Sequence, residues 1–231
     1  MRLTYYGHSA FLLEGDGARV FVDPWLTENP HTAATPADVD DLDAVLVTHG
    51  AFDHLGDAAE LVERTGADLV CDYATATVLT DRGLPEEYVS GYVWGAVHDG
   101  DGWEAKVVEA RHLSMFVEER VTAIPLAYVV SIGGERVYHM GDTSIFRDVE
   151  LFADLYDPTV ALIPVGQAEG YFTELHPDEA ALVAEWVDAD VAVPMHYVPG
   201  SLNPAEFEER CRDRGVETDV RRLSADETLV R

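Results

Sequence analysis

The chain has 231 residues, 47% of them hydrophobic, and its 44 acidic and 15 basic residues give a formal net charge of −29. This apolar content excludes a disordered chain and is sufficient for a large hydrophobic core. The acidity disfavours a nucleic-acid partner, because phosphate backbones would be repelled, and the presence of only two cysteines excludes a disulfide framework.

The N-terminal half of the sequence predicts a β-rich start followed by alternating strands and helices. Glu14-Gly15-Asp16-Gly17 marks the turn of a hairpin between two apolar runs. Apolar residues at strand and helix spacing then alternate along the chain. The predicted strands are 2–6, 10–14, 18–23, 44–48 and 67–71, and the predicted helices are 57–65 and 73–82.

The C-terminal half predicts a second β-rich region that again gives way to alternation. Gly133-Gly134 turns a hairpin in this region. The predicted strands are 105–110, 121–132, 136–140, 159–164 and 191–194, and the predicted helices are 145–153, 177–188 and 204–214. Because no linker or low-complexity tract divides the chain, we expect one α/β domain over 1–231.

A short segment with two histidines and an aspartate follows one of the buried strands. His49, Asp53 and His54 lie directly after the apolar run Ala44-Val45-Leu46-Val47. Loops at strand ends are where α/β folds place their chemistry. A pair of histidines at this spacing is a weak indication by itself, since many such residues only lie on surfaces.

Three further loops carry metal-ligand residues after apolar strands. His112 follows 106–110, Asp142 follows 137–140 and His196 follows 191–193. Asp142 alone could cap a turn, and His196 alone could be a core histidine satisfied by hydrogen bonds. Four loops with the same arrangement are hard to assemble by chance, so together they predict a metal site.

The ligand types narrow the metal and its chemistry. Imidazole and carboxylate suit zinc first, with manganese or iron as alternatives, and the absence of cysteine disfavours a closed structural zinc site. A cation with an open position lowers the pKa of bound water to about 7 and so provides a hydroxide nucleophile. We therefore expect one or two divalent ions and a hydrolytic reaction.

The sequence resembles the metallo-β-lactamase superfamily, whose motif is His-x-His-x-Asp-His with three later ligands. It is most similar to small metal-dependent hydrolases related to ascorbate-6-phosphate lactonases and, more distantly, to N-acyl-phosphatidylethanolamine phospholipases. The similarity runs from about Leu3 to about Pro204 and includes the segments 7–12, 22–27 and 176–180. It implies an αββα sandwich, in which two mixed β-sheets pack face to face with helices outside.

One ligand of the superfamily motif is replaced. Ala51 stands where the motif has its second histidine, and a methyl group cannot bind a metal. The resemblance implies a first ligand set of His49 and His112 and a second set of Asp53, His54 and His196, with Asp142 bridging the two ions. It also implies that Asp53 and Asp142 are the catalytic carboxylates: Asp53 ligates and accepts a proton from the water, and Asp142 bridges or orients. The second set is intact, whereas the first has lost one member.

Two other histidines are candidates for positions near the ions. His8 lies in the family-like Gly7-His8-Ser9 and could support or replace a ligand, but anchoring of the first hairpin is the favoured role. His176 precedes a helix that begins at Pro177, so it could contact substrate or cap that helix. The loops 24–40, 90–103, 112–121 and 166–176 are expected to line the pocket, with Trp25, Trp94, Trp103, Phe116, Tyr171, Phe172, Arg111 and Arg120 as contact candidates.

The leading hypothesis is a metal-dependent hydrolase of a small ester, lactone or phosphoester. A degenerate member of the fold with a binding or regulatory role is the alternative, and Ala51 is its main support. A diiron redox protein of the flavodiiron kind ranks last. Proteins of that kind have a glutamate at the position of Ala51 and usually continue into a flavin domain, and this sequence has neither feature.

The distribution of charge favours an acidic surface. Acidic residues are scattered through the chain, as at 86–87, 118–119 and 206–209, and Lys106 is the only lysine. Concentrated salt screens the resulting repulsion over about 3 Å at 1 M, so the composition favours a salt-adapted organism. No apolar run is long enough to span a bilayer, and the N-terminus enters a strand rather than a signal peptide. We therefore expect a cytoplasmic protein with a small-molecule substrate and no membrane partner.

Overall fold

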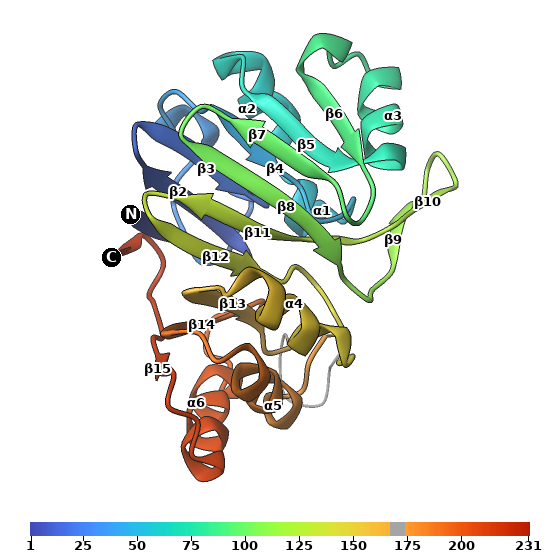
Figure 1. The fold of residues 1–231 in the computed structure, drawn as a ribbon. Coiled ribbons are helices and arrows are strands. Elements are labelled where there is room, and N and C mark those ends of the chain that lie inside the picture. The colour runs from blue at the N-terminus through green and yellow to red at the C-terminus, as the bar shows by residue number, and fades with distance from the viewer. Residues whose placement is uncertain (167–173) are drawn as a thin grey trace.

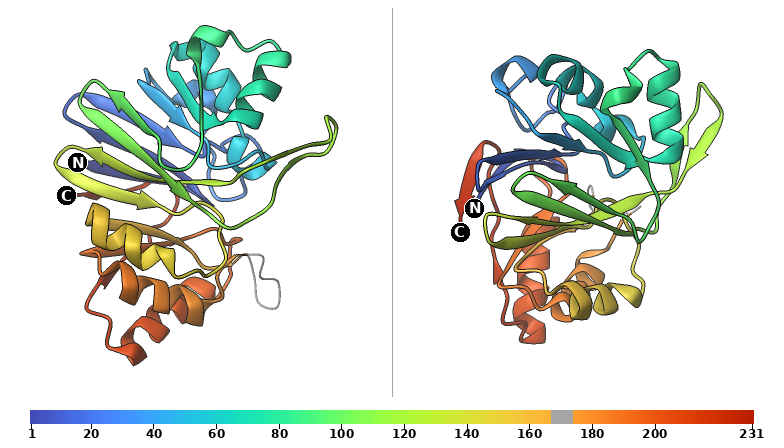
Figure 2. Two further views of the ribbon diagram at one scale, coloured as in Figure 1. Left: turned by 45° about the vertical axis from the view of Figure 1, so that its right-hand side comes forward. Right: turned by 45° about the horizontal axis from the view of Figure 1, so that its top comes forward.

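Two seven-stranded β-sheets pack face to face and helices cover their outer faces (Figures 1 and 2). The computed structural model describes residues 1–166 and 174–231. This architecture is the expected αββα sandwich. Strands 2–6 and 10–14 and the turn between 14 and 17 agree with the observed hairpins to within one residue.

The first sheet contains the N-terminal hairpins, a parallel half and the last strand of the chain. Its order is β16-β1-β2-β3-β4-β5-β6, with β1 to β3 antiparallel and β3 to β6 parallel. Its strands are β1 (Arg2–Gly7), β2 (Ala10–Gly15), β3 (Ala18–Val22), β4 (Ala44–Leu46), β5 (Asp68–Asp72), β6 (Val89–Tyr92) and β16 (Glu227–Val230).

The second sheet has the order β15-β14-β13-β12-β11-β8-β7. Its β7, β8, β11 and β12 are antiparallel neighbours, and β12 to β15 are parallel. Its strands are β7 (Val97–Gly100), β8 (Trp103–Glu109), β11 (Leu126–Ile132), β12 (Glu135–His139), β13 (Val160–Pro164), β14 (Val191–Met195) and β15 (Asp219–Val220).

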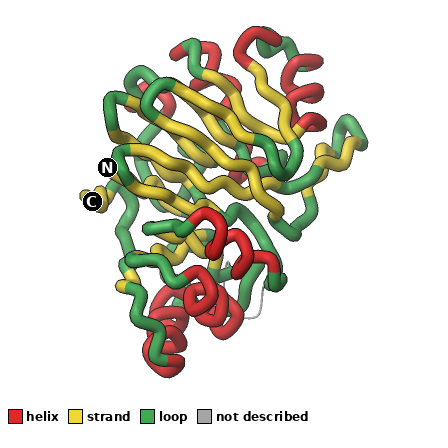
Figure 3. Tube along the Cα trace, in the orientation of Figure 1, coloured by secondary structure: helices red, strands yellow, loops and turns green. Residues whose placement is uncertain are grey.

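Three hydrophobic layers hold the sandwich together. The central layer joins the inner faces of both sheets, including Phe11, Tyr128 and Leu162. One outer layer packs α2 and α3 on the first sheet, and the other packs α4 to α6 on the second sheet (Figure 3). The helices are α1 (Phe52–Leu55), α2 (Ala58–Thr65), α3 (Tyr73–Asp81), α4 (Asp148–Tyr156), α5 (Pro177–Val187) and α6 (Asn203–Arg214), with short 3-10 turns at Pro36–Asp38 and Glu86–Tyr88.

A small hairpin projects from the body of the sandwich. It consists of β9 (Ser114–Phe116) and β10 (Val121–Ala123) and extends beyond the sheets (Figure 2). The expected continuous strand 121–132 is wrong, because Pro125 lacks the N–H that a strand interior needs and separates β10 from β11. None of the described helices is long and apolar enough to cross a membrane.

Candidate metal centre

The candidate metal centre lies at one edge of the sandwich, where loops from both sheets meet. His49 follows β4, while Asp53 and His54 lie on the adjoining short helix α1. The second sheet contributes His112 after β8, Asp142 after β12 and His196 after β14, and His8 lies in the turn between β1 and β2. Parallel strands deliver their carboxyl ends to the same edge, so residues distant in the sequence become neighbours.

Five histidines direct Nε2 toward the carboxylates of Asp53 and Asp142. His54 Nε2 lies 3.2 Å from Oδ1 of Asp142, and His196 Nε2 lies 3.0 Å from its Oδ2. The remaining distances are 3.1 Å from His8 Nε2 to Asp53 Oδ2, 3.6 Å from His112 Nε2 to Asp142 Oδ2 and 3.9 Å from His49 Nε2 to Asp142 Oδ2. Ligand atoms that surround one zinc ion at about 2.1 Å are about 3.4 Å apart in a tetrahedron.

Several of these buried atoms lack hydrogen bonds in spite of their closeness. Within residues 1–166 and 174–231, Nε2 of His49, His54 and His196 and Oδ1 of Asp142 make no hydrogen bond of acceptable geometry. Orphaned buried polar atoms are costly unless another group satisfies them. Nitrogen and oxygen atoms that converge without bonding to one another fit a divalent cation, so the residues of this centre are suited to hold a metal ion.

The opposite ring nitrogen of three histidines contacts an orienting oxygen. Asp23 accepts a 2.6 Å hydrogen bond from Nδ1 of His54, with both side chains fully buried. Glu174 approaches Nδ1 of His196 at 3.4 Å, and the hydroxyl of Thr48 lies 3.2 Å from Nδ1 of His49. Such contacts fix the ring and leave Nε2 for the metal, as is usual at protein metal sites.

The electrostatics divide the histidines into two groups. Burial together with His196 lowers the pKa of His8 to about 4, and burial together with His54 lowers the pKa of His49 to about 3. Burial also lowers the pKa of His196, but Asp142 raises it more, to about 9. For His54, Asp142 and Asp23 likewise outweigh burial and raise the pKa well above its usual range.

Both aspartates are ionised at neutral pH. Burial raises the pKa of Asp53, but the hydrogen bond from His8 and the charge of His54 lower it below the ordinary value. Burial acts in the same direction on Asp142, whose pKa is nevertheless held far below its usual range by His196 and His54. In the metal-free protein Asp142 therefore pairs with protonated His54 and His196, whereas Asp53 is bonded to neutral His8. A cation would replace the protons of His54 and His196.

Three groups of residues each have ligand atoms that lie within 4.8 Å of one another, and together they contain all six residues expected as metal ligands. These groups are His8, Asp53, His54 and His196; His49, His54 and Asp142; and His112, Asp142 and Glu174. His8 therefore lies inside the centre instead of only anchoring a hairpin. His176 is different: its ring accepts a hydrogen bond from the N–H of Asp178 at the start of α5, so it caps that helix.

Two residues of the centre were not anticipated from the sequence. Asp23 lies in the family-like segment 22–27, and its place directly after the apolar strand β3 is the sequence feature that could have identified it. Glu174 is buried and belongs to one of the three groups, but its neighbours in the sequence carry no ligand pattern. Their roles depend on contacts with residues far along the chain.

A cavity of about 450 Å³ opens onto the centre. Its floor includes His49, Asp142 and His196, and its apolar wall consists of Ala51, Phe52, Met115 and Val117. Phe52 and Val117 are 75% and 72% exposed, so they form the mouth of the cavity and not its floor.

Several expected pocket contacts lie elsewhere. Trp103 is buried in the layer between the sheets and Phe116 packs against Gly50, so neither is free for substrate. The guanidinium of Arg111 lies 4.5 Å from the ring centre of Phe146 and pairs with Glu109. Tyr171 and Phe172 lie outside the described residues.

Comparison with known proteins agrees with this fold and identifies the family of the chain. Residues 2–196 match the beta-lactamase superfamily domain. A UPF0173 metal-dependent hydrolase of Methanopyrus kandleri is 41% identical over 237 residues that cover 100% of both chains, and one of Pyrococcus horikoshii is 38% identical over 93% of each. The chain belongs to the metallo-β-lactamase superfamily and, within it, to the family of these relatives.

Solved structures extend the comparison. Igni18, a metallo hydrolase from Ignicoccus hospitalis, superimposes with a TM-score of 0.84 at 32% identity over 99% of this chain and 97% of that one. The isothiocyanate hydrolase from Delia radicum gut bacteria superimposes with a TM-score of 0.76 at 17% identity, over 100% and 99% of the two chains. The second likeness extends to the fold alone.

Proposed function

We propose that this protein is a metal-dependent hydrolase that cleaves a small neutral ester or lactone. The observation that supports it most directly is the group of Nε2 and carboxylate atoms on the floor of a partly apolar cavity. The names of the relatives as metal-dependent hydrolases support the same class of reaction. Zinc is the first candidate because imidazoles outnumber carboxylates in the centre, with manganese or iron as alternatives.

The proposed ligands fall into two sets that share Asp142. His49 and His112 belong to the first set, and Asp53 and His54 belong to the second together with His196. When bound, a divalent cation would acidify a water molecule and polarise the carbonyl group under attack. The ligand side chains would hold the cation, and the buried oxygens that contact their Nδ1 atoms would orient the rings.

Asp53 is the proposed acceptor for the proton of the attacking water. Its side chain keeps 12% exposure in the cavity, whereas that of Asp142 keeps 4%, and both are ionised. Addition of water to the carbonyl forms a carbon–oxygen bond, the acyl–oxygen bond then breaks, and the departing alkoxide takes up the proton. The products are a carboxylic acid and an alcohol, joined in one molecule when the substrate is a lactone.

The lining of the cavity supports a neutral substrate over a phosphoester. Among its described lining residues there is no lysine or arginine, and the undescribed residues 167–173 contain neither in their sequence. A phosphate group is generally held by such side chains, often as a bidentate arginine pair. Ala51, Phe52, Met115 and Val117 instead offer apolar surface for an acyl or alkyl group.

Metal content and activity can be measured on the same preparation. Protein purified without chelators is analysed for elements and then assayed with p-nitrophenyl acetate, a γ-lactone and bis(p-nitrophenyl) phosphate, before and after chelation and metal return. We expect about one or two metal ions per chain and metal-dependent cleavage of the ester or lactone. Faster cleavage of the phosphodiester would contradict the proposed substrate class.

Asp142→Ala provides the residue-level test, with Asp154→Ala on the exposed face of α4 as its control. We expect the first variant to lose bound metal and hydrolysis together, and the second to keep both. Retention of metal and activity by Asp142→Ala would contradict the ligand assignment.

Ala51 is the one observation that favours a degenerate, binding or regulatory protein, because it removes a ligand from the first set. Protein that contains no metal, takes up none when zinc, manganese or ferrous iron is added, and yet remains folded would favour that alternative over the hydrolase.

A further inference from the structure

His8 occupies an unusual place in the turn between β1 and β2. Its backbone is left-handed, with φ of 55°, and the pairing of β1 with β2 shifts register between Tyr5 and Gly7. A non-glycine residue in this conformation is costly and persists only where its surroundings hold it. The bulge turns the imidazole away from the hairpin and into the metal centre.

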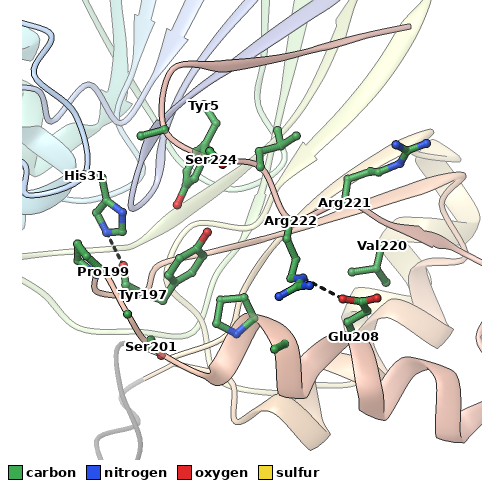
Figure 4. A pocket seen from close by; sticks show the side chains of 15 residues that line it. Tyr5, His31, Tyr197, Pro199, Ser201, Glu208, Val220, Arg221, Arg222 and Ser224 are labelled. Atoms are coloured by element: carbon green, nitrogen blue, oxygen red, sulfur yellow. Dashed lines mark hydrogen bonds and ion pairs between the residues drawn. The ribbon is translucent and has the colours of Figure 1, made fainter.

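The carbonyl oxygen of His8 accepts two hydrogen bonds. It accepts a 2.8 Å hydrogen bond from the main-chain N–H of His196 and a 3.2 Å bond from the hydroxyl of Tyr5. Tyr5 and the neighbouring Tyr197 line a separate hollow of about 610 Å³ (Figure 4). His196 also has a left-handed backbone, with φ of 59°, so two strained histidines are bonded to each other beside the second ligand set.

The atoms of His8 match those of the other proposed ligands. The orienting contacts of the centre are made to Nδ1 of His49, His54 and His196, whereas Nε2 is the atom that faces the carboxylates. His8 follows the latter pattern, because its Nε2 lies 3.1 Å from Oδ2 of Asp53. Its ring centre is 4.0 Å from that of His196.

We infer that His8 is a further protein ligand of the ion held by Asp53, His54 and His196 and shared by Asp142, an inference that rests on the proposed metal-dependent function. One ligand atom from each of His8, Asp53, His54 and His196 lies within 4.8 Å of those of the others. Donors of one zinc ion at about 2.1 Å are about 3.4 Å apart in a tetrahedron, so side-chain shifts of roughly 1 Å or less would complete the set.

With His8, the second set would contain three imidazoles and two carboxylates, one of them the shared Asp142. Protein groups would then fill the four or five positions that zinc accepts and leave no position for water. The second ion would then hold the two sheets together, since its ligands come from both. The open position would lie in the first set, where Ala51 leaves space beside His49 and His112.

The test counts imidazoles on the second ion. A His112→Ala background weakens the first set, and the protein is loaded with one equivalent of zinc or cobalt. X-ray absorption counts the imidazoles, the visible spectrum of the cobalt form reports coordination number, and chelator competition gives affinity. His8→Gln keeps an amide donor toward Asp53 but removes the imidazole, and His31→Gln makes the same exchange at a histidine that bonds the carbonyl oxygen of Tyr197.

We expect three imidazoles per ion in the background protein and two in His8→Gln, with a changed cobalt spectrum and an affinity loss beyond the roughly 10–100-fold range of residues that only orient a ligand. His31→Gln should retain all three properties. An unchanged imidazole count and cobalt spectrum in His8→Gln would overturn the inference while leaving the proposed function intact. Absence of metal from the wild-type protein would overturn both. If His8→Gln fails to fold, His8→Ala is measured in the same way.

Discussion

Asp23 and His54 form a fully buried pair in which Nδ1 of the imidazole lies 2.6 Å from Oδ2 of the carboxylate. The same aspartate accepts bonds of 2.7 Å from both the main-chain N–H and the hydroxyl of Thr48. These contacts connect the end of β3 to the loop after β4, so the carboxylate fixes the metal loop and one of its rings at the same time.

Asp23→Asn should therefore weaken metal binding without removing any proposed ligand. The amide matches the carboxylate in size but not in charge, so it lowers the basicity of His54 and fixes the orientation of its ring less firmly. We expect a loss of about 10–100-fold in affinity, the range found for residues that orient a ligand. Competition with a coloured chelator measures it, and Asp154→Asn on α4 is the control. Affinity equal to that of the control would contradict an orienting role for Asp23.

Ala51→His tests whether the first ligand set can be completed. Ala51 lies on the wall of the cavity, and Phe52 is 75% exposed, so the space beside Ala51 has not been filled by its aromatic neighbour. We expect the number of ions per chain to rise toward two, as measured by elemental analysis, with Ala51→Gln as a control of similar bulk. Equal metal content in the two variants would mean that the first set cannot accept a third imidazole.

Local sequence patterns were sufficient for the elements whose partners are near in the chain. The apolar runs and the turns at 14–17 and 133–134 predicted the hairpins of both sheets. β16 was missed because its partner β1 lies at the opposite end of the chain, and Arg2 pairs with Val230 only in the folded protein. β6 was missed because Ser90 and Gly91 interrupt its apolar pattern.

Those residues of the centre that directly follow a predicted strand could be predicted from the sequence. Those whose position depends on contacts between distant segments of the chain could not. His49, Asp53 and His54 belong to one short motif, and the structure brings them together with the later loops. The position of His8 depends on a left-handed residue and a strand bulge, neither of which is encoded by a hydrophobic period. Likewise, Asp23 has its role only because β3 and β4 are parallel neighbours.

Metal uptake should release protons at neutral pH. In the metal-free protein the pKa of His196 is raised to about 9 and that of His54 is raised as well, so both rings hold a proton that a cation must displace. His8 and His49, with pKa values of about 4 and 3, are already neutral. Affinity should consequently rise with pH by about tenfold per unit for each displaced proton, and the contribution of His196 should level off above about pH 9.

Calorimetric titration with zinc in two buffers of different ionisation enthalpy measures the released protons directly. We expect clear release at pH 7 and less at pH 9.5. The Asp154→Asn protein should behave as wild type. Identical heats in both buffers at pH 7 would contradict the protonated state of His54 and His196.

The acidic surface should make stability depend on salt. Ion pairs such as Arg214–Glu185 lose strength when salt is added, but 44 acidic residues face only 15 basic ones, so repulsion outweighs the pairs. The screening length falls from about 10 Å at 0.1 M salt to about 3 Å at 1 M. We expect the midpoint of thermal unfolding to rise between 0.1 and 2 M KCl, as followed by circular dichroism.

A variant with fewer charges separates screening of repulsion from a general effect of salt on apolar burial. Glu63, Glu118 and Asp154 are exposed and form no ion pair within the described part of the chain, so their replacement by Gln, Gln and Asn removes three negative charges without breaking a contact. This variant should unfold at a higher temperature than wild type in 0.1 M KCl, and the difference should vanish in 2 M KCl, because screening then does what the substitutions did. A difference that persists at high salt would mean that the substitutions act through something other than charge.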